Sequence, residues 1–76
     1  MTALALIAAA TAEAHAKHGR SFENAGPRLR LTIMMEELGE IARAVLDADE
    51  AHVLHEVAQL SSLGFRWLEA DTKGGE

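Results

Sequence analysis

The sequence contains no cysteine, one proline and only 4% aromatic residues in 76 positions. Without cysteine there is neither a disulfide framework nor a thiolate zinc site, which excludes the small secreted scaffolds and zinc fingers. A core of this size seldom supplies more than about 3–5 kcal/mol of net stability without a staple, a metal or a partner. We therefore expect one small domain that associates into a homodimer or homotetramer.

Basic side chains are also scarce, with 7 Lys and Arg against 12 Asp and Glu and a net charge of -5. The few cations are scattered along the chain from Lys17 to Lys73. A phosphate backbone would repel such a chain, because nucleic-acid binding needs clustered basic groups. Nucleic acid is therefore not an expected partner.

Long hydrophobic runs are missing, apart from the alanine-rich segment at residues 1–12. This segment has no basic residues before its apolar part and is too short to span a bilayer. Small residues around Ala14 resemble a signal-peptide cleavage site, but Leu4, Ile7 and Thr11 share one helical stripe. We favour an amphipathic first helix over a signal peptide, and expect a cytoplasmic protein with no membrane partner.

Glycine and proline divide the chain into three expected helices. The first runs from about Ala3 to His18 and ends at Gly19, a typical residue after a helix C-terminus. Pro27 suits the first position of the second helix, which runs to about Leu46. Asp47 or Asp49 can cap the third helix, which ends near Ala70. The polar segment at residues 19–26 is expected to be a loop.

The expected fold is all-α, a long helical hairpin with an additional N-terminal helix in one domain at residues 1–70. Residues 71–76 have no apolar anchor and are expected to be a disordered tail. The second and third helices each carry apolar residues at alternating spacings of three and four, as helices in bundles do. We call these ten positions the hairpin seam: Leu31, Met34, Leu38, Ile41, Val45, Val53, Val57, Leu60, Gly64 and Trp67. A second copy would complete a four-helix bundle on it.

Acidic residues lie beside the seam on both helices of the hairpin. Glu36, Glu37 and Glu40 flank it on the second helix, and Glu56 lies beside it on the third. Carboxylates gathered in a partly buried groove repel each other and need a cation, for which Mg²⁺ or Mn²⁺ is the natural choice. The alternative is a solvated helix face whose glutamates pair with arginines such as Arg43.

The segment Glu36-Glu37-Leu38-Gly39-Glu40, followed on the next helix by Glu56-Val57-Ala58-Gln59, resembles the EExxE…ExxD signature of the MazG-like all-α nucleoside triphosphate pyrophosphohydrolases. The resemblance extends from about His18 to Ala70. It implies a helical dimer or tetramer that hydrolyses nucleoside or deoxynucleoside triphosphates to the monophosphate and pyrophosphate with Mg²⁺. It also implies that Glu37, Glu40 and Glu56 bind the metal and that Glu36 supports the site or orients a water.

The chain departs from the signature at Gln59, where the family has an aspartate. A glutamine offers a carbonyl oxygen to a metal but no charge, so Gln59 is expected to be a weaker metal ligand. Two alternatives therefore stay open. One is a degenerate relative that only binds nucleotide or serves as a structural or regulatory module, and the other is a helical dimerisation module without a ligand.

Other side chains are candidates for holding the substrate. Arg66 is the first candidate for the charged transition state, followed by Lys17 and Arg30, together with Arg20. Phe22 is a candidate for stacking on the base, and His52 for contacting the ligand from the Glu56 stripe. A metal site built on histidines is disfavoured, because the Glu-x-x-His motif of di-iron bundles is missing.

Overall fold

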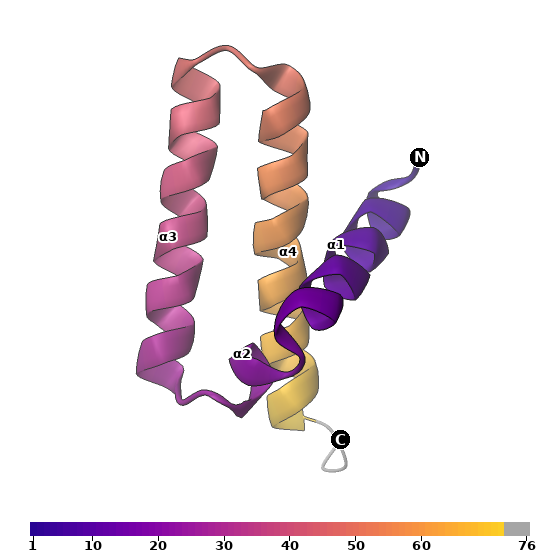
Figure 1. The fold of residues 1–76 in the computed structure, drawn as a ribbon, viewed down its shortest axis with the longest axis vertical. Helices are drawn as coiled ribbons and strands as arrows, with labels where there is room; N and C mark the ends of the chain where they lie inside the picture. Colours follow the sequence, from indigo (N-terminus) through magenta and orange to yellow (C-terminus); the bar gives the residue numbers. More distant parts are fainter. Residues whose placement is uncertain (73–76) are drawn as a thin grey trace.

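The computed structural model describes residues 1–72, which form four helices (Figure 1). These are α1 (Ala3–His18), α2 (Ser21–Asn24), α3 (Pro27–Leu46) and α4 (Glu50–Thr72). Residues 1–72 contain no strand. The expected all-α fold is therefore confirmed for the part of the chain that the structure describes.

Local signals explain where the long helices begin and end. The Thr2 hydroxyl accepts a hydrogen bond from the Ala5 amide at 3.0 Å and caps α1. Gly19 ends α1 with a φ of 59°, a conformation that favours glycine. Pro27 stands at the start of α3, where its missing N–H costs no hydrogen bond. The Asp49 carboxylate accepts from the His52 amide at 3.1 Å and caps α4.

Helix α2 lies within the segment that the sequence predicted as a loop. It is held by Arg30 of α3, whose guanidinium donates to the backbone oxygens of Phe22 and Glu23. A single helical turn is unstable alone, because its terminal carbonyls have no partner within the helix. Here Arg30 supplies the missing donors. No pattern in the sequence around α2 predicts this contact.

Helix α4 continues through Thr72, two residues beyond the expected end at Ala70. Asp71 anchors this last turn, because its carboxylate accepts from Arg30 at 3.1 Å and from the Trp67 indole at 2.9 Å. The expected tail thus begins later than Asp71. Its remaining residues, 73–76, lie outside the described residues.

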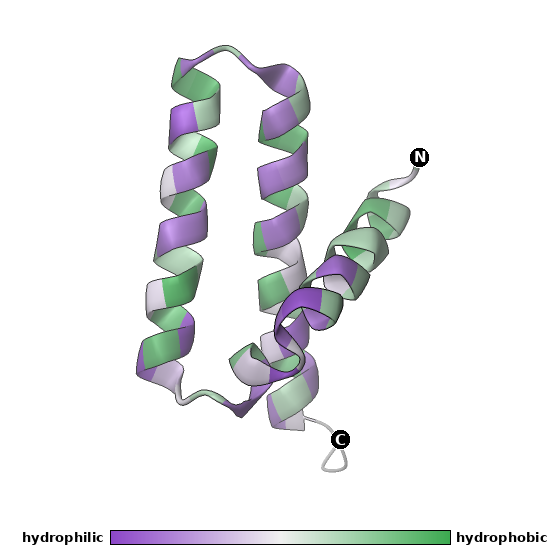
Figure 2. Cartoon of the chain, viewed as in Figure 1, coloured by the Kyte–Doolittle hydropathy of each residue, from purple (hydrophilic) through white to green (hydrophobic). Residues whose placement is uncertain are grey.

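Helices α3 and α4 run antiparallel as a hairpin, and α1 crosses α4 obliquely (Figure 1). The crossing is fixed by small residues, with Ala10 and Ala58 both buried. The hydroxyls of Thr11 and Ser62 are 2.7 Å apart, and Ser62 is completely buried. Figure 2 shows that hydrophilic positions recur along both hairpin helices, whereas the N-terminal half of α1 is largely hydrophobic.

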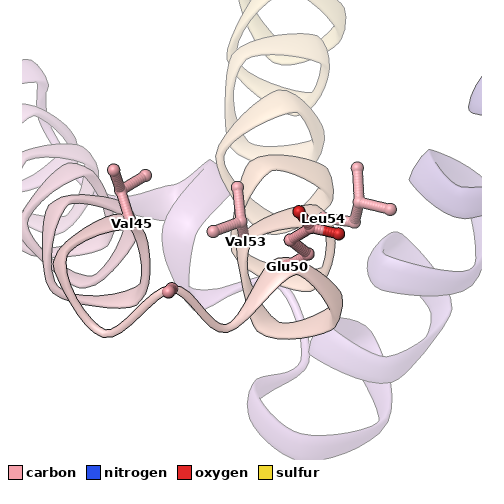
Figure 3. Close-up of a pocket in the computed structure, with 5 residues that line it drawn as sticks. Val45, Glu50, Val53 and Leu54 are labelled. Atoms are coloured by element: carbon pink, nitrogen blue, oxygen red, sulfur yellow. The ribbon is translucent and has the colours of Figure 1, made fainter.

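Much of the hairpin seam is exposed in the single chain. Leu31, Leu38 and Val45 of α3 are 54%, 56% and 57% exposed, and Val57 of α4 is 41% exposed. Near the α3–α4 turn, Val45, Val53 and Leu54 line an apolar cavity of about 500 Å³ (Figure 3). The Glu50 carboxylate borders this cavity together with the apolar side chains. Within residues 1–72 no helix has the length and apolarity that crossing a bilayer requires.

Candidate metal site

Three of the predicted ligands converge in the middle of the hairpin. Glu37 and Glu40 of α3 and Glu56 of α4 each offer a carboxylate oxygen, and these three oxygens lie within 4.8 Å of one another. Glu37 and Glu40 are three residues apart, so both point from the same flank of α3. We call these three residues the acid triad. Their spacing matches the reach of one divalent cation with oxygen ligands.

Glu37 carries the clearest sign of an unmet charge. Its Oε2 atom is buried and has no hydrogen-bond partner among the described residues. Burial, reinforced by the neighbouring Glu56 and Glu40 carboxylates, raises the pKa of Glu37 to about 8. The metal-free site therefore holds a proton on Glu37 at neutral pH, because two adjacent carboxylates avoid both being charged.

Glu56 is the charged partner of this pair. It is buried, with 6% of its surface exposed. A hydrogen bond from Glu37 lowers the pKa of Glu56, and a hydrogen bond to His52 lowers it further against the opposing effect of burial. The His52 Nε2 atom lies 2.7 Å from Glu56 Oε2. The next imidazole along α4, His55, lies edge-on to His52 with ring centroids 6.2 Å apart.

A cavity of about 320 Å³ opens beside Glu37 and reaches to α1 and α2. Its walls mix charged, polar and apolar groups, as a site for an amphipathic ligand requires. The lining residues are Ala14, His18, Ser21, Phe22, Ile33, Glu37, Gln59, Leu63 and Arg66. Four of the predicted site residues thus line one space: Phe22, Glu37, Gln59 and Arg66. Lined by Phe22 and Ile33 as well as these polar groups, the cavity can receive a ligand that reaches the acid triad.

A second cavity of about 200 Å³ lies on the other side of the acid triad, toward the α3–α4 turn. Glu40 and His52 line it together with Arg43, Ala44, Asp47 and Asp49. Arg43 is exposed and makes no ion pair within residues 1–72. Sequence reasoning treated Arg43 only as a surface partner of the glutamates, whereas the structure puts it at the edge of the site.

Gln59 lines the same cavity as Glu37, but its side chain is engaged with α1. The Gln59 amide nitrogen donates to Glu13 Oε1 at 2.9 Å. The neutral amide thereby helps to join α4 to α1 in addition to bordering the acid triad. Its expected role as a metal ligand stays a prediction.

Arg66 is buried, with 3% of its surface exposed, and forms a two-bond contact with Glu23 of α2. Arg66 Nε donates to Glu23 Oε2 at 2.9 Å and Nη2 donates to Oε1 at 3.2 Å. Burial alone would raise the pKa of Glu23, but the hydrogen bonds from Arg66 and His15 lower it to about 2. The charge of Arg66 is thus already balanced within the protein.

Arg30 and Phe22 also serve the packing of α2. Arg30 is 6% exposed and spends its guanidinium on backbone oxygens of α2 and on Asp71. Phe22 is 4% exposed, and the guanidinium carbons of Arg30 and Arg66 lie 5.7 and 5.2 Å from its ring centroid. One edge of the buried ring borders the cavity, so Phe22 is a wall residue and not the free stacking residue that the sequence suggested.

The remaining predicted residues lie outside the two cavities. Lys17 is exposed and pairs with Glu13 at 3.6 Å, one turn earlier in α1. Glu36 is exposed and does not belong to the acid triad. Arg20 lies 3.7 Å from Glu23. Lys17 is therefore linked to the site through Glu13, which also accepts from Gln59, whereas Glu36 makes no side-chain hydrogen bond or ion pair within residues 1–72.

Sequence reasoning missed Glu23 and His15, which organise one wall of the cavity. His15 Nε2 lies 2.7 Å from Glu23 Oε2, which also binds Arg66. Glu23 falls in a segment read as a loop, and its partner Arg66 is 43 residues away. The one available signal was a lone glutamate beside an aromatic residue, which is too common to be informative.

Comparison of this chain with known proteins gives no match. No family model matches the chain. Neither a curated protein nor a solved structure matches it. The function is therefore inferred from the residues of the site itself.

Proposed function

We propose that this chain is a metal-dependent hydrolase of nucleoside or deoxynucleoside triphosphates that releases pyrophosphate. The observation that carries the proposal is the acid triad, in which Glu37, Glu40 and Glu56 bring oxygens within 4.8 Å. The buried, unpartnered Oε2 of Glu37 supports a cation there, because a buried carboxylate oxygen without a partner is costly. The resemblance of the same residues to the MazG-like motif implies the same activity.

The donor set suits Mg²⁺ or Mn²⁺, since both prefer carboxylate oxygens and keep waters that a substrate phosphate can replace. When bound, such an ion neutralises polyphosphate charge and acidifies a water. Glu37 and Glu40 would hold it from α3 and Glu56 from α4. Gln59 donates to Glu13 through its amide nitrogen, so its carbonyl oxygen is the atom that it could add to the site.

The reaction is attack of a water on the α-phosphorus, with cleavage of the bond to the β-phosphate oxygen. A carboxylate must take the proton of that water. Glu37 is the first candidate for this task, through a carboxylate oxygen not used to bind the ion, because it lines the cavity that a substrate would enter. Glu36 is the second candidate by the family resemblance, from its exposed place next to Glu37.

The triphosphate needs cationic partners besides the metal, and the two buried arginines are committed to Glu23, Asp71 and α2. We infer that Arg43, at the edge of the second cavity, supplies such a charge, and that His18, in the wall of the first, offers a ring nitrogen for a hydrogen bond. The nucleoside would occupy the cavity lined by Phe22 and Ile33.

Association completes the proposal. Four seam residues that are at least 41% exposed in the single chain would be buried by a second hairpin, giving the four-helix bundle of a homodimer or a homotetramer of two such pairs. Each Å² of apolar surface that is buried in this way stabilises the assembly by about 25 cal/mol. A chain of this size needs such a contribution to be stable.

A second candidate function is a binding or structural module with a degenerate site. The contact between Gln59 and Glu13 favours it, because the last acid of the motif is replaced by a residue already used in packing. A thermal melt separates it from the enzyme. Binding at 100 times the dissociation constant stabilises the fold by about 2.7 kcal/mol, whereas a solvated acidic face gains little from Mg²⁺ or Mn²⁺.

The test of the activity is pyrophosphate release from a panel of ordinary and modified nucleoside and deoxynucleoside triphosphates with Mg²⁺ or Mn²⁺. Turnover that is lost in Glu37→Gln, kept in the surface control Glu69→Gln and kept or raised in Gln59→Asp would support the proposal. The new aspartate would face Glu13, so the pair Glu13→Gln with Gln59→Asp controls for repulsion. Activity only in the Gln59→Asp variants would show a degenerate site, and silence in all variants would favour a structural module.

A further inference from the structure

The acid triad supplies three oxygen ligands, and the fourth position of the motif is a neutral glutamine. The amide nitrogen of Gln59 donates to Glu13 of α1 at 2.9 Å, so Gln59 can offer a metal only its uncharged carbonyl oxygen. A divalent cation bound by three carboxylates has further positions to fill, from water or from another side chain. A donor beside the triad that the motif does not contain can fill one of them.

His52 is that donor. Its Nε2 atom lies 2.7 Å from Oε2 of Glu56, so the ring already points at one member of the triad. It also lines the 200 Å³ cavity together with Glu40, which is a second member. Residues four apart on a helix project from one face, and this spacing is the one by which a helix chelates a metal with two side chains.

The imidazole is free to change partner. His52 is exposed, with 52% of its side-chain surface accessible, and its contact with Glu56 is one hydrogen bond that a cation can replace. The His52 nitrogens do not belong to the group of ligand atoms that lie within 4.8 Å of one another, so the ring must turn about its side-chain bonds to bind a cation held by the triad. The nitrogen that binds must carry no proton, so binding through Nε2 requires the proton of this hydrogen bond to leave or to move to Nδ1.

We propose that His52 is the fourth protein ligand of the metal site, which makes the site one of three carboxylates and one imidazole. This inference depends on the proposed metal site and specifies which cation it takes. An imidazole nitrogen binds first-row transition ions well and Mg²⁺ poorly, since Mg²⁺ demands oxygen ligands. The site accordingly selects Mn²⁺ or a later divalent transition ion over Mg²⁺.

The alternative role for His52 is to orient Glu56 from outside the coordination sphere, as hydrogen-bonded partners of metal ligands do. The two roles differ in what they predict for selectivity. An orienting residue affects Mn²⁺ and Mg²⁺ alike, whereas a ligand affects mainly the ion that accepts nitrogen. His55 provides the matched control, because it is the neighbouring exposed histidine of α4 and makes no hydrogen bond to the triad within residues 1–72.

The decisive measurement is pulsed electron paramagnetic resonance of Mn²⁺ added to the full chain, without nucleotide. We expect a nitrogen coupling of a directly bound imidazole in the wild type and in His55→Gln, and its loss in His52→Gln. The coupling should change when the protein carries ¹⁵N-labelled histidine. Circular dichroism of each variant verifies the fold, which the exposed position of His52 should leave intact.

Titration of the same variants with Mn²⁺ and Mg²⁺ supplies the second readout. His52→Gln should weaken Mn²⁺ binding by about 10-fold to 100-fold and Mg²⁺ binding by less than about 3-fold. Equal losses for both ions, or bound Mn²⁺ without a nitrogen coupling in the wild type, would overturn the ligand role and leave the proposed hydrolase standing. Failure of the wild type to bind either ion would overturn the metal site and the ligand role together.

Discussion

The proton on Glu37 leads to a quantitative prediction for cation binding. A cation can bind the acid triad only after it displaces this proton. With a pKa of about 8 for Glu37, binding at pH 7 should release close to one proton, and the release should fall toward zero above pH 9. The apparent affinity should rise from pH 6 to pH 8 by on the order of 10-fold to 100-fold and level off above pH 9.

Isothermal titration calorimetry with Mn²⁺ in buffers of different ionisation enthalpy measures this proton release directly. Glu37→Gln should bind the ion more weakly and release no proton from this position. The control Glu69→Gln changes an exposed carboxylate outside the triad and should behave as the wild type. Proton release close to zero at pH 7, or an affinity that does not change from pH 6 to pH 8, would refute the shared-proton description of the site.

The same proton sets the sign of a stability effect in the metal-free chain. Between pH 4.5 and about 8 the folded chain keeps a proton on Glu37 that the unfolded chain has released. The folded state then binds more protons, so the free energy of unfolding falls as the pH rises through this window. The slope is below about 1.4 kcal/mol per pH unit, because partial exposure of the site screens it. Urea unfolding at several pH values measures it, and saturating Mn²⁺ should remove it.

Three further substitutions test the fold that carries the site. Glu23→Gln leaves the Arg66 guanidinium buried without its charge partner, and should cost about 3–5 kcal/mol in urea unfolding; a loss below about 1 kcal/mol would contradict the packing described. Ala48→Gly relieves a left-handed backbone conformation with a φ of 55° and should stabilise the chain by about 0.5–1 kcal/mol, visible as a higher melting temperature. Leu38→Glu should reduce the mass of the particle in light scattering to that of one chain, whereas Leu29→Glu, about 180° around α3, should not.

The main helices could be predicted because residues close to each helix end determine where the helix begins or stops. Thr2, Gly19, Pro27 and Asp49 each act on backbone groups within a few residues of themselves, so their meaning does not depend on the rest of the fold. The convergence of the acid triad could also be predicted, because it depends on the hairpin and not on distant contacts. An antiparallel hairpin with a short turn brings the middle of α3 opposite the middle of α4, so motif residues on facing flanks meet.

Contacts made by α1 and α2 could not be predicted. The pairs Glu23–Arg66 and Glu13–Gln59 join residues 43 and 46 positions apart, and each depends on where α1 crosses α4. The first helix was expected to be amphipathic, with Leu4, Ile7 and Thr11 on one stripe, but it is rich in alanine on every side and has almost no amphipathic character. Its sequence therefore does not specify one packing face. Arg66 was therefore expected to serve a substrate, although a carboxylate from an unforeseen helical turn lies against it.

The dependence of α2 on Arg66 has a consequence for synthesis. The 43 residues between Glu23 and Arg66 take about 2–9 s to add at ordinary rates of translation. During that interval the four residues of α2 exist without the arginine that neutralises Glu23, and so short a helix does not persist alone. The wall of the 320 Å³ cavity is thus among the last parts of the molecule to form, and a nascent chain that ends before Arg66 lacks one of the two arginines that cover the Phe22 ring.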